Sequence, residues 1–331
     1  MWTLNWPYGT ASIQALGGML GPVDFKLAGG QQFQPFYVAP WVGEPIDPDL
    51  PGLLHSMRGE WPCVPFSRDT APSETPPHWQ AFARTDPAFA QPHGPGANQP
   101  WQLLQQREHE LLIGIDYPAK SAVARLERRL VANPDAPEID ITLRIYPRAD
   151  AIWPVALHPT LRLPQRPGSV RLRPGAFSQA VTYPLAFEAS SQLRLNATAT
   201  DLAHMPGLDQ TLDLSHLPLA NASEELVQLM DCDGGFSLDY LDENARVTLT
   251  WDASLLPDVV LWISNGGRPH APWLGRNFAL GVEPLNGTFE LGGVLQAPPT
   301  HPLAQRQGLV LRADTPVDVH YRISAGLIAQ S

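Results

Sequence analysis

Proline is the feature that most restricts what this chain can fold into. The chain has 36 prolines among 331 residues, which is about 11% and roughly twice the usual frequency. A proline inside a helix costs about 3 kcal/mol, because it removes a backbone hydrogen bond and clashes with the preceding turn. Prolines spread this evenly exclude a mostly helical bundle, whereas a β protein accommodates them in turns, at strand starts and on sheet edges. We therefore expect a β protein.

Alternation of apolar and polar residues supports this expectation and predicts where the strands lie. Three antiparallel strands are expected in succession at residues 111–117, 122–132 and 139–146. The Gly17-Gly18 pair indicates a tight turn between two strands within residues 11–27. Further strands are expected at residues 169–172, 192–196, 236–240, 246–252, 259–264, 278–283, 308–312 and 317–324.

One short helix and one long irregular segment interrupt the strand pattern. Residues 222–230 indicate a helix, with Ser223 as its cap and Glu224 and Glu225 in its first turn. Residues 34–99 are irregular and rich in proline, yet tryptophans recur along them, which argues against disorder. Because loops this long in a compact domain usually have a function, we expect this segment to line a site.

Nothing in the sequence marks a boundary between domains. The strand pattern runs from end to end without an internal repeat, a low-complexity tract or a shift in composition. Residues 1–331 are therefore expected to form one all-β domain. Two packed, mostly antiparallel sheets are the natural arrangement for so many strands.

Charge and cysteine content narrow the classes of function. The formal net charge is −11, and no run of Lys or Arg supplies the positive surface that a nucleic-acid backbone requires. No apolar stretch approaches the roughly 18 residues of a membrane-spanning helix, and the N-terminal residues lack a secretory signal pattern. The two cysteines, Cys63 and Cys232, are too few for a tetrahedral zinc site and suit a reduced protein. We expect a cytoplasmic protein that binds neither nucleic acid nor a membrane.

Five short motifs, taken in their order along the chain, point to a function. They are Gly17-Gly18, the run Arg-Gly-Glu-Trp-Pro-Cys-Val-Pro-Phe at residues 58–66, His93-Gly94 followed by Trp101, Pro-Val-Ala-Leu-His-Pro at 154–159, and Gly-Val-Glu-Pro at 281–284. Together they resemble the aldose 1-epimerase (galactose mutarotase-like) superfamily, and especially its hexose-6-phosphate 1-epimerase-like branch. The resemblance covers most of the chain and implies a β-supersandwich with a sugar cleft on one face.

The resemblance also implies an activity, the interconversion of the α and β anomers of an aldose or a sugar derivative. Ring opening needs one group that protonates the ring oxygen and another that takes the proton of the C1 hydroxyl, roles that His and Glu can fill near neutral pH. By resemblance, Glu283 is the general base, His158 the general acid, and His93 a hydrogen-bond donor near the ring oxygen. These side chains should converge on one open cleft, separated by about the width of a pyranose ring. No metal or other cofactor is implied.

Further contacts with the carbohydrate are implied in the same way. Arg58 would hold sugar hydroxyls, and Asp233 is favoured over Asp231 as a binding residue because of its spacing to the following phenylalanine. Trp101 and Trp262 lie near the motifs, and an indole face packs well on the C–H face of a sugar. A large aromatic side chain in a β-sandwich is, however, more often part of the core.

Departures from the family pattern leave alternatives open. The sugar-phosphate branch usually has an arginine four residues after the histidine of His-Gly, where this chain has Ala97. An unphosphorylated sugar is therefore as consistent with the sequence as a hexose 6-phosphate, unless Arg58 or Arg84 grips the phosphate instead. A surface pair of Arg58 with Glu60 is equally consistent with the sequence. The alternative functions are carbohydrate binding without catalysis and, on the same scaffold, a lyase or hydrolase, which would need a tyrosine base or a second carboxylate facing Glu283.

Overall fold

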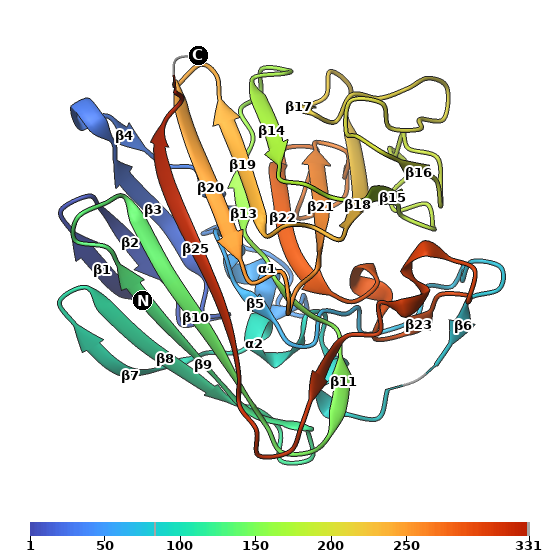
Figure 1. Ribbon diagram of the computed structural model, residues 1–331, viewed down its shortest axis with the longest axis horizontal. Helices are drawn as coiled ribbons and strands as arrows, with labels where there is room; N and C mark the ends of the chain where they lie inside the picture. The colour runs from blue at the N-terminus through green and yellow to red at the C-terminus, as the bar shows by residue number, and fades with distance from the viewer. Residues whose placement is uncertain (83, 330–331) are drawn as a thin grey trace.

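Antiparallel β-sheets are the main secondary structure of the protein, whose computed structural model describes residues 1–82 and 84–329 (Figure 1). Strands account for 44% of the chain and helices for 7%, so the all-β prediction is confirmed. The largest sheet contains β7 (Gln102–Arg107), β8 (Glu110–Asp116), β9 (Val123–Ala132), β10 (Glu138–Pro147), β14 (Val170–Pro174), β17 (His216–Leu217), β19 (Gly235–Tyr240), β20 (Ala245–Trp251) and β25 (Val317–Leu327). Its order is β17-β14-β19-β20-β25-β10-β9-β8-β7.

A second large sheet contains β5 (Pro62–Cys63), β12 (Val155–Leu157), β13 (Thr160–Arg162), β15 (Gln179–Thr182), β16 (Thr198–Ala199), β18 (Ser223–Met230), β21 (Asp258–Asn265) and β22 (Phe278–Asn286). Its order is β16-β15-β18-β21-β22-β12-β5, and β13 also pairs with β22. The smaller sheets are β1 (Trp2–Trp6), β2 (Gly9–Ile13), β3 (Leu20–Lys26) and β4 (Gln32–Phe33), then β11 (Ala151–Trp153) with β24 (Leu309–Leu311), and β6 (Gln80–Ala81) with β23 (Leu295–Gln296).

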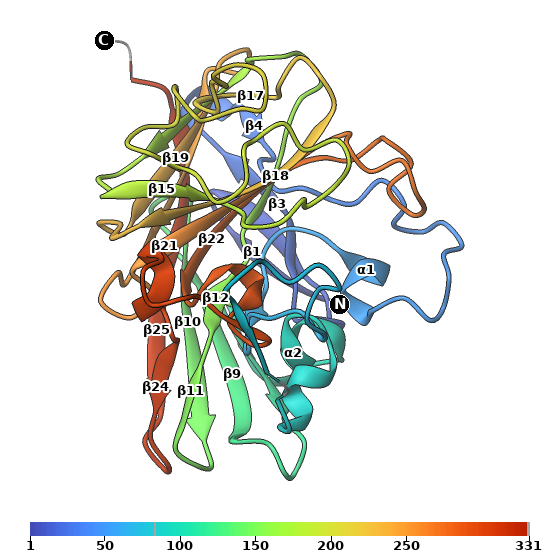
Figure 2. The same ribbon diagram turned by 90° about the vertical axis from the view of Figure 1, so that its right-hand side faces the viewer.

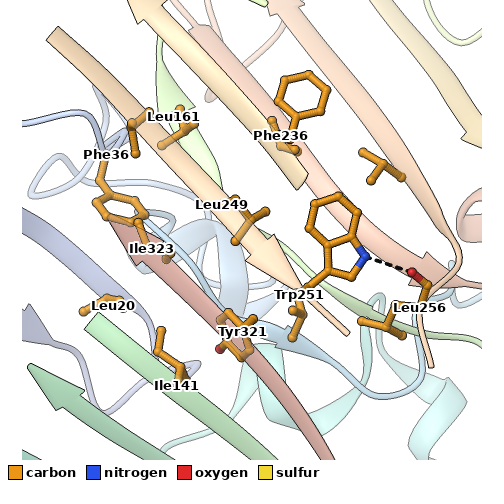
Figure 3. Close-up of a cluster of buried hydrophobic side chains, with 14 of the residues drawn as sticks. Leu20, Phe36, Ile141, Leu161, Phe236, Leu249, Trp251, Leu256, Tyr321 and Ile323 are labelled. Atoms are coloured by element: carbon orange, nitrogen blue, oxygen red, sulfur yellow. Dashed lines mark hydrogen bonds between the residues drawn. The ribbon is translucent and has the colours of Figure 1, made fainter. Parts of the chain in front are cut away.

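The main core lies between the two large sheets. Side chains from the inner face of the nine-stranded sheet, among them Phe236, Leu249 and Ile323, pack in one buried cluster with Leu161 of β13 (Figure 3). Trp251 belongs to the same cluster, and its indole N–H donates to the Leu256 carbonyl at 2.9 Å. Side chains alternate between the two faces of a strand, so those of β21 and β22 that point away from this core can line a site on the opposite face of the sheet.

The helix predicted at residues 222–230 is wrong, because this segment is strand β18. All eight of its residues are buried, and it pairs with both β15 and β21. A strand buried on both faces lacks the alternating pattern that identifies a strand in a sequence. The residues interpreted as a helix cap make other contacts, since the Ser223 hydroxyl donates to the Glu225 carboxylate.

The strand predicted at residues 192–196 is also wrong. This stretch makes a single bridge, between Leu193 and Gly207, and the next strand is β16. The other predicted strands are present, with ends that differ by a few residues.

Residues 34–82 and 84–99 form a mostly irregular segment, as the sequence predicts. The short helices α1 (Gly52–Ser56) and α2 (Gly94–Asn98) lie together on one side of the molecule (Figure 2). The 3-10 turns are η1 (Ala28–Gly30), η2 (Pro87–Ala90), η3 (Phe289–Leu291) and η4 (Pro302–Gln305). Among the described residues, no helix is long and apolar enough to cross a membrane.

A buried ion pair fixes this segment to the nine-stranded sheet. Arg128 of β9 donates to the Glu60 carboxylate, and both side chains are fully buried. Tyr321 of β25 completes the cluster, because it donates to Glu60 at 2.9 Å and accepts from Arg128 at 2.9 Å. The surface pair of Arg58 with Glu60 is therefore excluded, since Glu60 is buried with another arginine and the Arg58 Nε donates to the Ser56 carbonyl.

We predict that Glu60→Gln lowers the free energy of unfolding by about 3–5 kcal/mol, because it leaves the Arg128 charge buried without a counter-charge. Asp318→Asn is the matched control. It breaks a partly exposed pair with Arg144 on the same sheet and should cost less than about 1 kcal/mol. Urea unfolding of both variants measures the difference, and equal losses would contradict the prediction.

Candidate active site

The register of the second sheet brings two of the predicted residues together. β12 and β13 both pair antiparallel with β22, through Ala156 opposite Leu285 and Thr160 opposite Gly281. The register is the same on both sides of the interruption at His158, so His158 lies opposite Glu283. Residues 125 positions apart in the chain thus become cross-strand neighbours, whose side chains are close enough to interact.

The two side chains are in contact. Nε2 of His158 lies 3.2 Å from Oε1 of Glu283, while Nδ1 lies 3.1 Å from the Thr160 hydroxyl. The imidazole stacks on the Trp61 indole, with ring centroids 4.1 Å apart, and its backbone N–H donates to the Trp61 carbonyl at 2.8 Å. The His158 ring is therefore fixed by contacts at its face and its edge, and the backbone of His158 is fixed by a hydrogen bond.

The sequence predicts that the acid and the base are separated by about the width of a pyranose ring. This prediction is wrong for His158 and Glu283. The closest atoms of the two side chains lie only 3.2 Å apart. The chemistry does not require a wider separation, because the ring oxygen and the C1 hydroxyl oxygen of a hemiacetal are bonded to the same carbon.

Gly281 leaves the room that the Glu283 carboxylate occupies. A Cβ at residue 281 would lie 2.3 Å from Oε1 of Glu283. Residues 281 and 283 are two positions apart on β22, so their side chains point to the same face of the sheet. A side chain at 281 would therefore push the Glu283 carboxylate away from His158.

The third predicted residue, His93, reaches the same place from the loop segment. Its ring stacks on Phe66 at 4.9 Å and lies 5.5 Å from the His158 ring, edge to face. His93 adopts a left-handed backbone conformation with φ 59°, just before α2. The Asn98 side-chain amide fixes this turn by donating to the carbonyls of Pro92 at 2.6 Å and Gly94 at 2.8 Å.

The turn also requires glycine at position 94. Gly94 has φ 75°, and a Cβ there would lie 2.4 Å from the Val64 carbonyl oxygen. The His-Gly motif of the sequence is therefore a condition for placing the His93 ring.

These three side chains line one cavity of about 260 Å³. The irregular segment 34–99 supplies a large part of its wall, as the sequence predicts. Aromatic rings surround the polar groups, and the apolar and aromatic lining residues are Pro51, Leu53, Leu54, Met57, Trp61, Phe66, Pro92, Phe187, Leu226, Trp262 and Trp273. A mostly apolar hollow with a few convergent polar groups is the usual form of a small-molecule site.

Burial favours the uncharged forms of these groups. It lowers the pKa of His158 well below its ordinary value and lowers the pKa of His93 to about 4. It also raises the pKa of Glu283 well above its ordinary value, and the nearby Glu290 carboxylate adds to that increase. Oε1 of Glu283 and Nδ1 of His93 are buried atoms that make no hydrogen bond within residues 1–82 and 84–329, although Oε1 contacts His158.

Trp262 is the one predicted binding residue that lines the cavity. Its indole N–H donates to the Glu224 carboxylate at 3.2 Å. Trp101 is instead a core residue, with its indole N–H donating to the Gly96 carbonyl at 2.8 Å. The lining of the cavity includes neither Trp101 nor the other two predicted residues, Arg58 and Asp233.

Asp233 has a structural role at a turn. Its carboxylate accepts from the backbone N–H groups of Ala176 at 2.8 Å and Gly235 at 3.2 Å. Its neighbour Asp231 pairs with Arg306. The spacing to a phenylalanine therefore does not place either aspartate in the cavity.

The sequence analysis missed three charged residues that line the cavity, Arg68, Arg268 and Glu290. Arg68 follows the 58–66 motif by two residues, whereas Arg268 and Glu290 belong to no motif. The Glu224 carboxylate accepts the hydrogen bond from the Trp262 indole. Its place near the cavity was also missed, because residues 222–230 were predicted to form a helix. In the part of the chain that the structure describes, no group of His, Cys, Asp and Glu is placed to hold a metal ion.

Solved structures match the chain over nearly its whole length, although no protein-family model and no curated protein matches it. A protein from Escherichia coli K12 described as a candidate aldose 1-epimerase is 13% identical, with a TM-score of 0.64 and 98% of each chain covered. The GalM/aldose epimerase homologue from C. elegans is 9% identical, with a TM-score of 0.62 and coverage of 99% of this chain and 98% of that one. A galactose mutarotase related enzyme from Lactobacillus acidophilus is 12% identical, with a TM-score of 0.61 and coverage of 98% and 96%. The chain therefore has the galactose mutarotase-like fold.

The low pKa of His93 predicts how stability depends on pH. Between pH 6.5 and about 4 the unfolded chain binds a proton at this histidine and the folded protein does not, so the free energy of unfolding falls as the pH falls. The loss is at most about 3 kcal/mol, an upper bound because the ring borders the cavity. Urea unfolding should show that the wild type loses stability relative to His93→Gln as the pH falls across this range. A constant difference would exclude a His93 that stays neutral in the folded protein across this range.

Proposed function

We propose that the protein is an aldose 1-epimerase, or mutarotase, acting on an aldose or a sugar derivative. One observation carries the proposal: His158 and Glu283 touch on the wall of a cavity, 3.2 Å apart, with His93 beside them. An acid and a base at that spacing can serve two oxygens on one carbon. The fold shared with proteins described as aldose epimerases and mutarotases supports the same reading.

Proton transfer in this site needs only one proton on the pair. With that proton on Glu283 both groups are neutral, which burial favours, and its transfer to His158 gives the ionised acid and base. In that form, Glu283 takes the proton of the C1 hydroxyl while His158 protonates the ring oxygen, and the ring opens. Rotation about the C1–C2 bond presents the other face of the aldehyde, and the reverse transfers close the ring as the opposite anomer.

The rest of the cavity supplies binding rather than chemistry. The imidazole of His93 can donate a hydrogen bond near the ring oxygen, and the indole of Trp262 offers an apolar face to the C–H side of the sugar. Arg58 and Arg84, which could have replaced the arginine missing at Ala97, do not line this cavity. Arg84 donates instead to the carbonyls of Gly293 and Gly292.

Loss of the Glu283 carboxylate should abolish most of the rate. We predict that Glu283→Gln lowers the rate of anomer exchange about 10²–10⁴-fold, because the amide cannot accept a proton. Exchange NMR on equilibrated aldoses, with and without protein, measures this rate. Asp233→Asn is the control, because the sequence predicts that Asp233 binds the sugar whereas the structure places it outside the cavity. The exchange rate of this variant should match that of wild type.

Two results would refute the proposed activity. One is that no aldose or aldose phosphate exchanges faster with the wild-type protein. The other is that Glu283→Gln exchanges at the wild-type rate. Tight binding of a sugar with exchange at the background rate would favour the alternative function, a carbohydrate-binding protein without catalysis.

The proton count of the pair predicts a bell-shaped dependence of the rate on pH. A second proton blocks the base at low pH, and this limb lies well below 6.5 because burial lowers the pKa of His158. Loss of the only proton removes the acid at high pH, and this limb lies well above 4.5 because the pKa of Glu283 is raised. Rates measured from pH 4 to 10 test the profile, and a rate that rises steadily with pH would contradict it.

A further inference from the structure

A second carboxylate, that of Glu290, lines the same cavity as Glu283. It belongs to η3, and its side chain is only 11% exposed. The Tyr183 hydroxyl donates to its Oε1 at 2.6 Å, and Nη1 of Arg68 lies 4.0 Å from the same oxygen. The Arg68 backbone N–H also donates to the Glu290 carbonyl at 2.8 Å, so the backbones of the two residues are joined as well.

Tyr183 acts here as a hydrogen-bond donor. Burial and the neighbouring Glu290 raise the pKa of Tyr183 well above its ordinary value, so its hydroxyl keeps its proton. It is therefore not the tyrosine base that a lyase would need. Its bond leaves the remaining lone pairs of the Glu290 carboxylate for other donors.

Both arginines of the cavity already have carboxylate partners. Arg68 stands beside Glu290, and Arg268 pairs with Glu188 at 2.9 Å and lies 3.8 Å from Glu224. A phosphate on a substrate would have to displace a carboxylate from one of these guanidinium groups. It would also meet the Glu290 charge at close range in a cavity of about 260 Å³.

We propose that Glu290, held by Tyr183 and Arg68, is a specificity-determining residue that accepts hydrogen bonds from sugar hydroxyls and excludes substrates with an anionic group at the position it faces. The inference rests on the proposed function and goes beyond it, because it assigns the choice between a neutral and a phosphorylated sugar to one side chain. Arg68 acts with it as a donor to the same hydroxyls. The donor and the acceptor together suit an uncharged, hydroxyl-bearing substrate.

The variant Glu290→Gln tests this assignment without changing the shape of the side chain. It removes the negative charge, keeps an oxygen for the Tyr183 hydroxyl, and leaves Arg68 without a counter-charge. For the preferred neutral aldose, we expect kcat/KM to fall about 10- to 100-fold, mostly through KM, because a hydrogen bond to a charged acceptor becomes one to a neutral amide. For the 6-phosphate of the same sugar, kcat/KM should rise at least tenfold.

The experiment measures anomer exchange with D-glucose, D-galactose, D-mannose and the 6-phosphate of each, for wild type and Glu290→Gln. Glu110→Gln is the matched control, because it removes the same charge from an exposed pair with Arg129 outside the cavity and should leave the preference unchanged. Urea unfolding of each variant establishes that it is folded. A wild type that prefers the phosphates, or a Glu290→Gln variant with the wild-type preference, would overturn the proposal.

Titration with inorganic phosphate provides a second readout that needs no turnover. Glu290→Gln should bind phosphate at least tenfold more tightly than wild type, and Glu110→Gln should bind it as weakly as wild type does. Equal phosphate affinity in wild type and Glu290→Gln would overturn the proposal even if no sugar is ever turned over. Absence of exchange with every sugar would instead refute the proposed function and leave the phosphate result to decide the role of Glu290.

Discussion

The buried contact between Arg128 and Glu60 is the constraint on which the site depends most. It fixes the backbone next to Trp61 against the nine-stranded sheet, and Trp61 supplies both the ring under His158 and the carbonyl that accepts its backbone N–H. A charge pair without access to water has little freedom to rearrange, since either partner alone would be costly to bury. The position of the proposed acid is thus set by an interaction that belongs to the other large sheet, through Tyr321 as well as Arg128.

The remaining geometry comes from two kinds of backbone. Strand pairing places His158 opposite Glu283, and Gly281 leaves room for the Glu283 carboxylate. Turn geometry places His93, through Gly94 and the amide of Asn98. The proposed base therefore lies on β22 and the proposed acid between two short strands that pair with β22, whereas His93 and part of the cavity wall lie on the irregular segment.

Sequence reasoning reached the fold because proline density and alternation leave few alternatives to antiparallel sheets. It found the short motifs whose residues meet in the cavity, and it failed where position depends on tertiary contacts. Strand β18 is buried on both faces, so its pattern has no period of two and its polar start resembles a helix cap. Glu290 and Arg268 come from segments with no motif, and only the folded chain brings them to the cavity. The burial of Glu60 could not be deduced from the sequence either, because its partner Arg128 is 68 residues away in the chain.

The apolar wall at residues 51–57 is hydrogen-bonded to other parts of the irregular segment. The Leu53 backbone N–H donates to the Asn98 side chain at 3.1 Å, the Trp41 indole N–H to the Leu54 carbonyl at 2.8 Å, and the Ala39 backbone N–H to the Met57 carbonyl at 3.0 Å. The proposed acid and base and this part of the cavity wall consequently come from separate stretches of the polypeptide. A substitution within residues 51–57 can therefore alter the shape of the cavity without touching the strands around His158 and Glu283.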